Sequence, residues 1–172
     1  MNKKRHNLLV TLLIIYIIVI IYFMFFGFGR PQINNTIQEY RFSIIPTRIP
    51  LWYPKKLSLL WFFSLGNLLA FVPFGILIPM IFDTKYHKFI FIFLISILSL
   101  EILQMITYLG SFDTEDIIIN SIGATIGFFS YKISNKFKLV SQKIISTLFL
   151  ILILSFTMIS FAEIFNKFVA CT

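Results

Sequence analysis

The fold is decided by residues 101–127, EILQMITYLGSFDTEDIIINSIGATIG, which place polar side chains between long runs of Ile, Leu and Phe. These polar side chains are carboxylates and amides: Glu101, Gln104, Asp113, Asp116 and Asn120. A carboxylate in apolar surroundings is costly unless it has a partner, a proton or a water-filled cavity. The stretch therefore predicts a polar site inside an otherwise apolar protein.

The composition places the chain among integral membrane proteins. Of its 172 residues, 58% are hydrophobic and 13% are charged, whereas a soluble domain carries roughly a quarter charged residues. The net charge of +8 does not indicate a nucleic-acid partner, because basic residues of membrane proteins gather in cytoplasmic loops. The chain has one cysteine, Cys171, so we expect neither an internal disulfide nor a thiolate metal site.

Five apolar runs are long enough to cross a bilayer: residues 8–28, 59–82, 89–109, 116–131 and 144–162. About 20 residues at 1.5 Å per residue cross a hydrocarbon core of roughly 30 Å. We therefore expect one all-α bundle of about five transmembrane helices, forming a single domain over residues 1–172. The first run could also be a signal peptide, but it is longer than such a segment and has no small-residue cleavage site after it. This favours an uncleaved helix.

The segments between the runs predict the topology. Residues 29–58 contain Pro46, Pro50 and Pro54, which forbid a continuous helix and indicate an extended or interfacial segment. With a cytoplasmic N-terminus, nine Lys and Arg residues lie on the inner side and six on the outer side, in the direction of the positive-inside rule. We therefore expect a cytoplasmic N-terminus and an outer proline-containing loop. Residues 163–172 are expected to be a tail.

Two polar residues of the second and third runs are expected at the same depth. Helical rise places Asn67 and Glu101 about 12 Å below the outer edge of the membrane. Gln104 follows Glu101 at i+3 and so shares its helix face. Side chains from two spans are thus expected to face each other in the outer half of the bundle.

The fourth run carries a stripe of polar and small residues. Asp116, Asn120, Gly123 and Gly127 are spaced by 4, 3 and 4 residues, which places them on one helix face. Glycines at this spacing let a neighbouring helix approach closely, so the stripe should face the bundle. We predict a polar pocket open to the outer leaflet, formed by Glu101, Gln104, Asp113, Asp116, Asn120, Asn67 and Arg41.

Structural roles are open alternatives for most of these residues. Asp113 and Asp116 suit a helix N-terminus, where carboxylates cap the backbone and complement the dipole. Asn67 and Asn120 suit interhelical hydrogen bonds. Glu101 is harder to explain as structure alone, because an amide or hydroxyl would serve at lower cost. Carboxylates also suit Mg²⁺ or Ca²⁺, but we expect no metal, cofactor or catalytic residue, since neither zinc spacing nor a Ser/His/Asp set is present.

Three separated blocks give the chain a family resemblance. They are Arg41-Phe-Ser-Ile-Ile-Pro46, Asn67-Leu-Leu-Ala-Phe-Val-Pro-Phe-Gly75, and Glu101-Ile-Leu-Gln104 followed by residues 110–127. Over residues 41–131 the sequence resembles the VanZ family. The resemblance implies a small multi-span protein of Gram-positive bacteria that gives low-level teicoplanin resistance. Many relatives have an arginine where this chain has Gly110, which leaves Arg41 and Arg48 as the positive partners for Asp113.

Our first hypothesis is a non-enzymatic resistance protein of the plasma membrane. Teicoplanin carries a fatty-acyl chain that anchors it in lipid beside its cell-wall target. The expected partners are membrane lipid and either the lipidated glycopeptide or the lipid-linked cell-wall precursor, bound at the outer leaflet. Two alternatives stay open. One is a proton-coupled carrier or membrane enzyme that uses Glu101, and the other is a structural subunit of an envelope complex.

Overall fold

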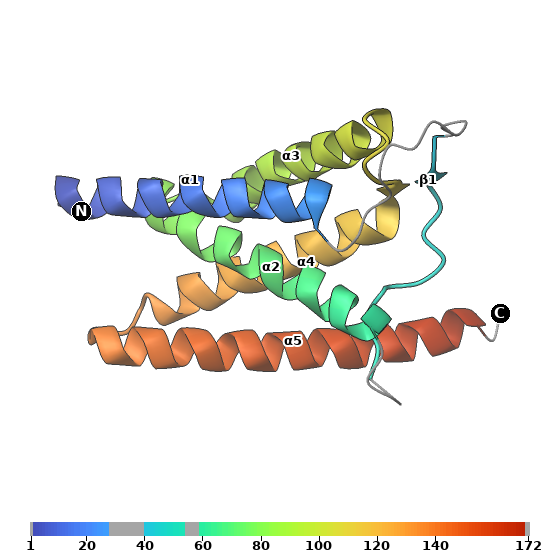
Figure 1. The fold of residues 1–172 in the computed structure, drawn as a ribbon. Coiled ribbons are helices and arrows are strands. Elements are labelled where there is room, and N and C mark those ends of the chain that lie inside the picture. Colours follow the sequence, from blue (N-terminus) through green and yellow to red (C-terminus); the bar gives the residue numbers. More distant parts are fainter. Residues whose placement is uncertain (1, 28–39, 54–58, 171–172) are drawn as a thin grey trace.

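The computed structural model describes residues 2–27, 40–53 and 59–170. Its helices and short strands are α1 (Lys3–Phe26), β1 (Phe42–Ser43), α2 (Leu59–Phe82), α3 (Tyr86–Ile106), β2 (Phe112–Asp113), α4 (Thr114–Ser134) and α5 (Val140–Ala170), as Figure 1 shows. Five helices among the described residues are long and apolar enough to cross a membrane. The prediction of a helical, multi-pass membrane protein is therefore confirmed.

α2 matches its predicted run, whereas α4 and α5 extend beyond their runs at both ends and α1 and α3 begin before theirs. α1 begins at Lys3 rather than at residue 8, and α4 continues to Ser134. The prediction of a tail over residues 163–172 was wrong for its described part, because α5 continues to Ala170. Hydropathy marks only the apolar part of a helix, whereas backbone hydrogen bonds continue into polar turns outside the hydrocarbon.

The bundle has two chemically different ends. At the basic end, α1, α3 and α5 begin while α2 and α4 end. This end holds nine of the fifteen Lys and Arg residues and, among the residues that the structure describes, a single acid, Asp83. At the opposite end, which we call the loop end, residues 40–53 and the two strands lie beside the first turn of α4 (Figure 1). The side of the membrane that each end faces stays a prediction.

α2 and α4 cross at very short range in the centre of the bundle. A Cβ atom added to Gly123 would collide with the Leu68 carbonyl oxygen, and one added to Gly127 would collide with that of Val72. On the α2 side, a Cβ added to Gly75 would collide with the backbone of α4. The absence of side chains at these positions lets the two backbones touch, as expected for small-residue packing in membranes.

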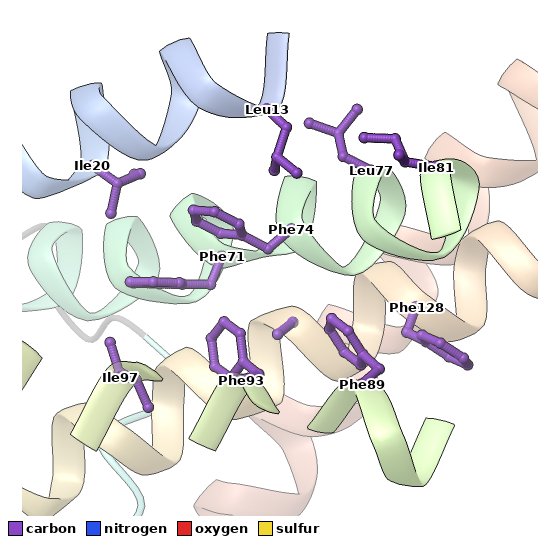
Figure 2. Close-up of a cluster of buried hydrophobic side chains, with 11 residues drawn as sticks. Leu13, Ile20, Phe71, Phe74, Leu77, Ile81, Phe89, Phe93, Ile97 and Phe128 are labelled. Atoms are coloured by element: carbon purple, nitrogen blue, oxygen red, sulfur yellow. The ribbon is translucent and has the colours of Figure 1, made fainter. Parts of the chain in front are cut away.

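Aromatic side chains fill the space between α2, α3 and α4. Figure 2 shows Phe71 and Phe74 of α2 facing Phe93 of α3. The ring of Phe89 stacks on that of Phe128 at a centroid distance of 5.1 Å. Such pairs bury large apolar areas and fix the relative positions of the helices.

α1 packs on α2 along one side of the bundle. Leu13 and Ile20 are its buried contributions to the aromatic cluster. The Tyr16 hydroxyl donates a hydrogen bond of 2.7 Å to the carbonyl oxygen of Ala70. This carbonyl belongs to the turn of α2 that precedes Pro73, where the proline ring weakens the regular ladder.

Residues 40–53 cross the loop end and are fastened to α5. The Asn166 side chain both accepts from the backbone N–H of Ile49, at 2.9 Å, and donates to its carbonyl, at 2.8 Å. The backbone N–H of Tyr53 donates to Glu163 at 2.9 Å. Between these points Leu51, only 2% exposed, inserts into a cluster formed by α2, α4 and α5. These contacts explain why the last turns of α5 are ordered helix.

Candidate functional site

The start of α4 is fixed by the loop that precedes α2. β1 pairs in parallel with β2, with Phe42 opposite Phe112 and Ser43 opposite Asp113. The Thr114 hydroxyl donates to the carbonyl oxygen of Ser43 at 3.1 Å and to that of Ile44 at 2.9 Å. The first turn of α4 is therefore held in one place relative to residues 40–53.

Asp113 is the N-cap of α4. Its side chain accepts a hydrogen bond of 2.8 Å from the backbone N–H of Glu115, in the geometry that satisfies an otherwise unpaired helix donor. Asp116 and Glu115 add negative charge in the same first turn, where the helix dipole favours it. The capping role considered for Asp113 from the sequence is therefore present.

Glu101 lies in the interior of the bundle. It is 2% exposed, and its Oε2 atom accepts from the backbone N–H of Asp113 at 3.3 Å. A hydrogen bond to an N–H offsets part of the cost of burying a carboxylate. This contact joins the end of α3 directly to the residue that caps α4.

Asp116 and Asn67 join α4 to α2. The Asn67 Nδ2 atom donates to Asp116 Oδ1 at 3.2 Å. One helical turn further along α4, Asn120 is 3% exposed. Within the described ranges its buried Oδ1 atom has no hydrogen-bond partner. Such an orphan acceptor is rare, and it marks a place where a donor can bind.

Two of the residues predicted for the pocket, Gln104 and Arg41, have other surroundings. Gln104 is buried, and its Nε2 atom donates to the carbonyl oxygen of Met24 in α1 at 2.6 Å. The Arg41 side chain is exposed, while its carbonyl accepts from the N–H of Phe112 at 3.0 Å. In the part of the chain that the structure describes, neither side chain hydrogen-bonds to the polar cluster of Asn67, Glu101, Asp116 and Asn120.

The sequence did not single out Glu115, which connects the first turn of α4 to residues 40–53. Its Oε1 atom accepts from the backbone N–H of Thr47 at 3.1 Å and from the hydroxyl at 2.8 Å. The Arg48 Nε atom lies 3.9 Å from Glu115 Oε2, and the guanidinium stacks over the Trp52 ring at 5.2 Å. The sequence did contain a signal for this contact, namely an acid in the first turn of a predicted helix and arginines in the preceding loop.

The chemistry of the cluster is dominated by hydrogen-bond acceptors. Glu101, Asp116 and the Asn120 carbonyl come from two adjacent helices, with Asn67 as the amide donor from a third. Among the described residues, no three His, Cys, Asp or Glu side chains are grouped as metal ligands would be. The arrangement therefore suits a ligand that presents hydroxyl, amide or ammonium groups.

Comparison with known proteins places this site in a family context. Residues 13–135 match the sequence profile of the family described as VanZ/LLP1. The chain belongs to the VanZ/LLP1 family. The matched region contains all seven residues predicted for the pocket and ends before α5 begins at Val140. The part of the chain that carries the VanZ/LLP1 features is thus α1 to α4 with the loop.

One curated relative shows how far the similarity extends. The chain is 36% identical over 74 residues to Protein VanZ of Enterococcus faecium. The aligned region covers 42% of this chain and 45% of Protein VanZ, so it spans less than half of that relative. No solved structure matches the chain.

Proposed function

We propose that this VanZ/LLP1 protein lowers the sensitivity of a Gram-positive cell to teicoplanin-type, lipidated glycopeptides. The family match over residues 13–135 and the partial likeness to Protein VanZ support this role. In this proposal the protein lies in the plasma membrane, with the N-terminus cytoplasmic and the loop end facing outward. The excess of lysines and arginines at the basic end supports that orientation.

The proposed mechanism is binding of the drug, or of the lipid-linked cell-wall precursor, at the polar cluster. The observation that supports this mechanism most directly is the side-chain carbonyl of Asn120. It is buried and has no hydrogen-bond donor among the described residues, and it lies one helical turn from the Asp116–Asn67 pair. Both candidate ligands carry hydroxyl and amide donors and are anchored in the membrane by lipid. A ligand held there is kept from a productive encounter between drug and precursor.

Expression in a susceptible Gram-positive host tests this proposal. The minimal inhibitory concentrations of teicoplanin and vancomycin are compared for wild type and for Asp116→Asn, which keeps the shape but removes the charge. We expect wild type to protect more against teicoplanin than against vancomycin, and Asp116→Asn to lose that protection. Asp83→Asn is the matched control, because Asp83 lies at the opposite end. Equal protection against both drugs, or full protection by Asp116→Asn at equal protein level, would reject the binding mechanism.

Burial of Glu101 supports a second candidate, a proton-coupled carrier or membrane enzyme. A carboxyl group that is 2% exposed and lies between apolar spans is a suitable site for proton exchange. Glu101→Gln preserves the volume of the side chain and removes the titrating group. Full activity of Glu101→Gln would exclude this candidate, whereas loss of activity in Glu101→Gln with retention in Asp116→Asn would favour it over binding.

A further inference from the structure

An apolar hollow of about 410 Å³ lies between α1 and α3, with α2 as its floor. Its lining includes Ile17 and Ile21 of α1, Phe71 and Phe74 of α2, and Ile92 and Leu103 of α3. Figure 2 shows the two phenylalanines between Ile20 of α1 and Ile97 of α3. The volume falls within the range of roughly 300–1,000 Å³ that is typical of ligand pockets.

The lining of this hollow is suited to hydrocarbon. Its two serines are already satisfied, since Ser96 donates to the Ile92 carbonyl at 2.9 Å and Ser99 to that of Ile95 at 2.8 Å. An occupant that needs hydrogen bonds therefore gains little along these walls. There is no bulk water at the depth of the membrane-spanning helices, so a lipid acyl chain is the occupant that best suits this hollow.

The basic end of the hollow has the opposite character. Thr84 belongs to the lining, and its buried Oγ1 atom lacks a partner within the described ranges. α3 starts directly after it, and the side chain of its N-cap Lys85 makes no hydrogen bond to the first N–H groups of α3. Lys88 lies one turn before Ile92, on the helix face that lines the hollow.

These groups all favour an anion. A helix N-terminus attracts phosphate through its N–H groups and its dipole, and two lysines and a free hydroxyl add to this. The acid nearest in sequence, Asp83, has its own partner, because Lys132 Nζ donates to its Oδ1 atom at 2.7 Å. The hollow therefore joins an apolar body to a positively charged end.

We propose that the hollow binds one acyl chain of an anionic bilayer phospholipid whose phosphate lies at Thr84, Lys85 and Lys88. Charge complementarity selects a lipid rather than a second copy of the chain, whose basic end carries the same excess of positive charge. The phosphate end of this site lies at the basic end of the bundle, whereas the polar cluster lies toward the loop end. It therefore does not depend on the proposed resistance function.

Native mass spectrometry of the full chain tests the headgroup. The protein in detergent is mixed with phosphatidylglycerol and phosphatidylcholine that carry identical acyl chains, and the bound lipid is counted. We expect one phosphatidylglycerol to be retained in preference to phosphatidylcholine. Lys85→Gln and Lys88→Gln should each weaken its binding by about fivefold. Equal retention of the two lipids, or unchanged binding in both variants, would overturn the proposal.

A blocking variant tests the acyl-chain site. Ser96→Phe fills the hollow, while Thr157→Phe makes a similar change on the exposed face of α5, where the hydroxyl also bonds its own helix. We expect lipid to be lost only from Ser96→Phe, and retention of lipid by that variant in its folded form would contradict the site.

Cross-linking of wild type provides a test that does not depend on folding of the variant. Phosphatidylglycerol with a photoactivatable diazirine on its acyl chain is expected to label α1 and α3 beside the hollow, including Ile17 and Ile92. Labelling concentrated on the exposed face of α5 would overturn the proposal.

Discussion

Substitution of Gly127 by alanine tests the central contact of the bundle. An added Cβ would overlap the Val72 carbonyl oxygen and lie 2.9 Å from the Val72 carbonyl carbon and 3.1 Å from the Gly75 Cα. Carbon atoms prefer about 3.5–4.0 Å, so α2 and α4 must separate by about 0.6 Å or more. Overpacking of this kind costs about 1–3 kcal/mol, whereas the better helix propensity of alanine returns up to about 1 kcal/mol.

The expected net effect is a loss of about 1–2 kcal/mol in the free energy of unfolding, because the neighbouring atoms are backbone and cannot rotate away. Gly66→Ala is the matched control, since nothing lies within 4 Å of a Cβ added there. That variant should be unchanged or slightly more stable. Reversible unfolding in mixed micelles, followed by circular dichroism, measures both. Equal stability of the two variants would refute the close crossing of α2 and α4.

Three further predictions follow from individual contacts: two concern a single hydrogen bond each, and the third concerns an ion pair. Asp113→Ala removes the N-cap of α4 and should cost about 1 kcal/mol, whereas Asp113→Asn should keep most of it, as measured by unfolding. Gln104→Leu removes the bond to Met24 and should cost about 0.6–1.7 kcal/mol; unchanged stability would show that this bond does not help to hold α1 in the bundle. The hydrogen bond and charge of Lys132 lower the pKa of Asp83, so their stabilisation is present above pH ~4 and is lost as pH falls through the lowered pKa. Asp83→Asn should flatten this acid limb of the stability profile, and an unchanged limb would exclude the pair as its cause.

The sequence by itself determined the helical membrane fold. Apolar runs of about 20 residues are long enough to cross the hydrocarbon core of a membrane. There they must be helical, because each unpaired backbone group in hydrocarbon costs several kcal/mol. The same logic required a partner, a proton or a water-filled cavity for Glu101, and the structure gives it the Asp113 N–H as a partner. The 4, 3, 4 spacing from Asp116 to Gly127 likewise predicted the face of α4 that packs inward.

Only the tertiary structure decided which side chains meet. Depth along a helix can be counted from the sequence, but rotation and crossing angle depend on packing against every neighbour. Gln104 therefore bonds α1 rather than the cluster, and Arg48 lies beside Glu115. The hollow between α1 and α3 could not be predicted either, because its walls come from separate helices that pack around the aromatic rings of α2. No pattern within one helix records such a gap.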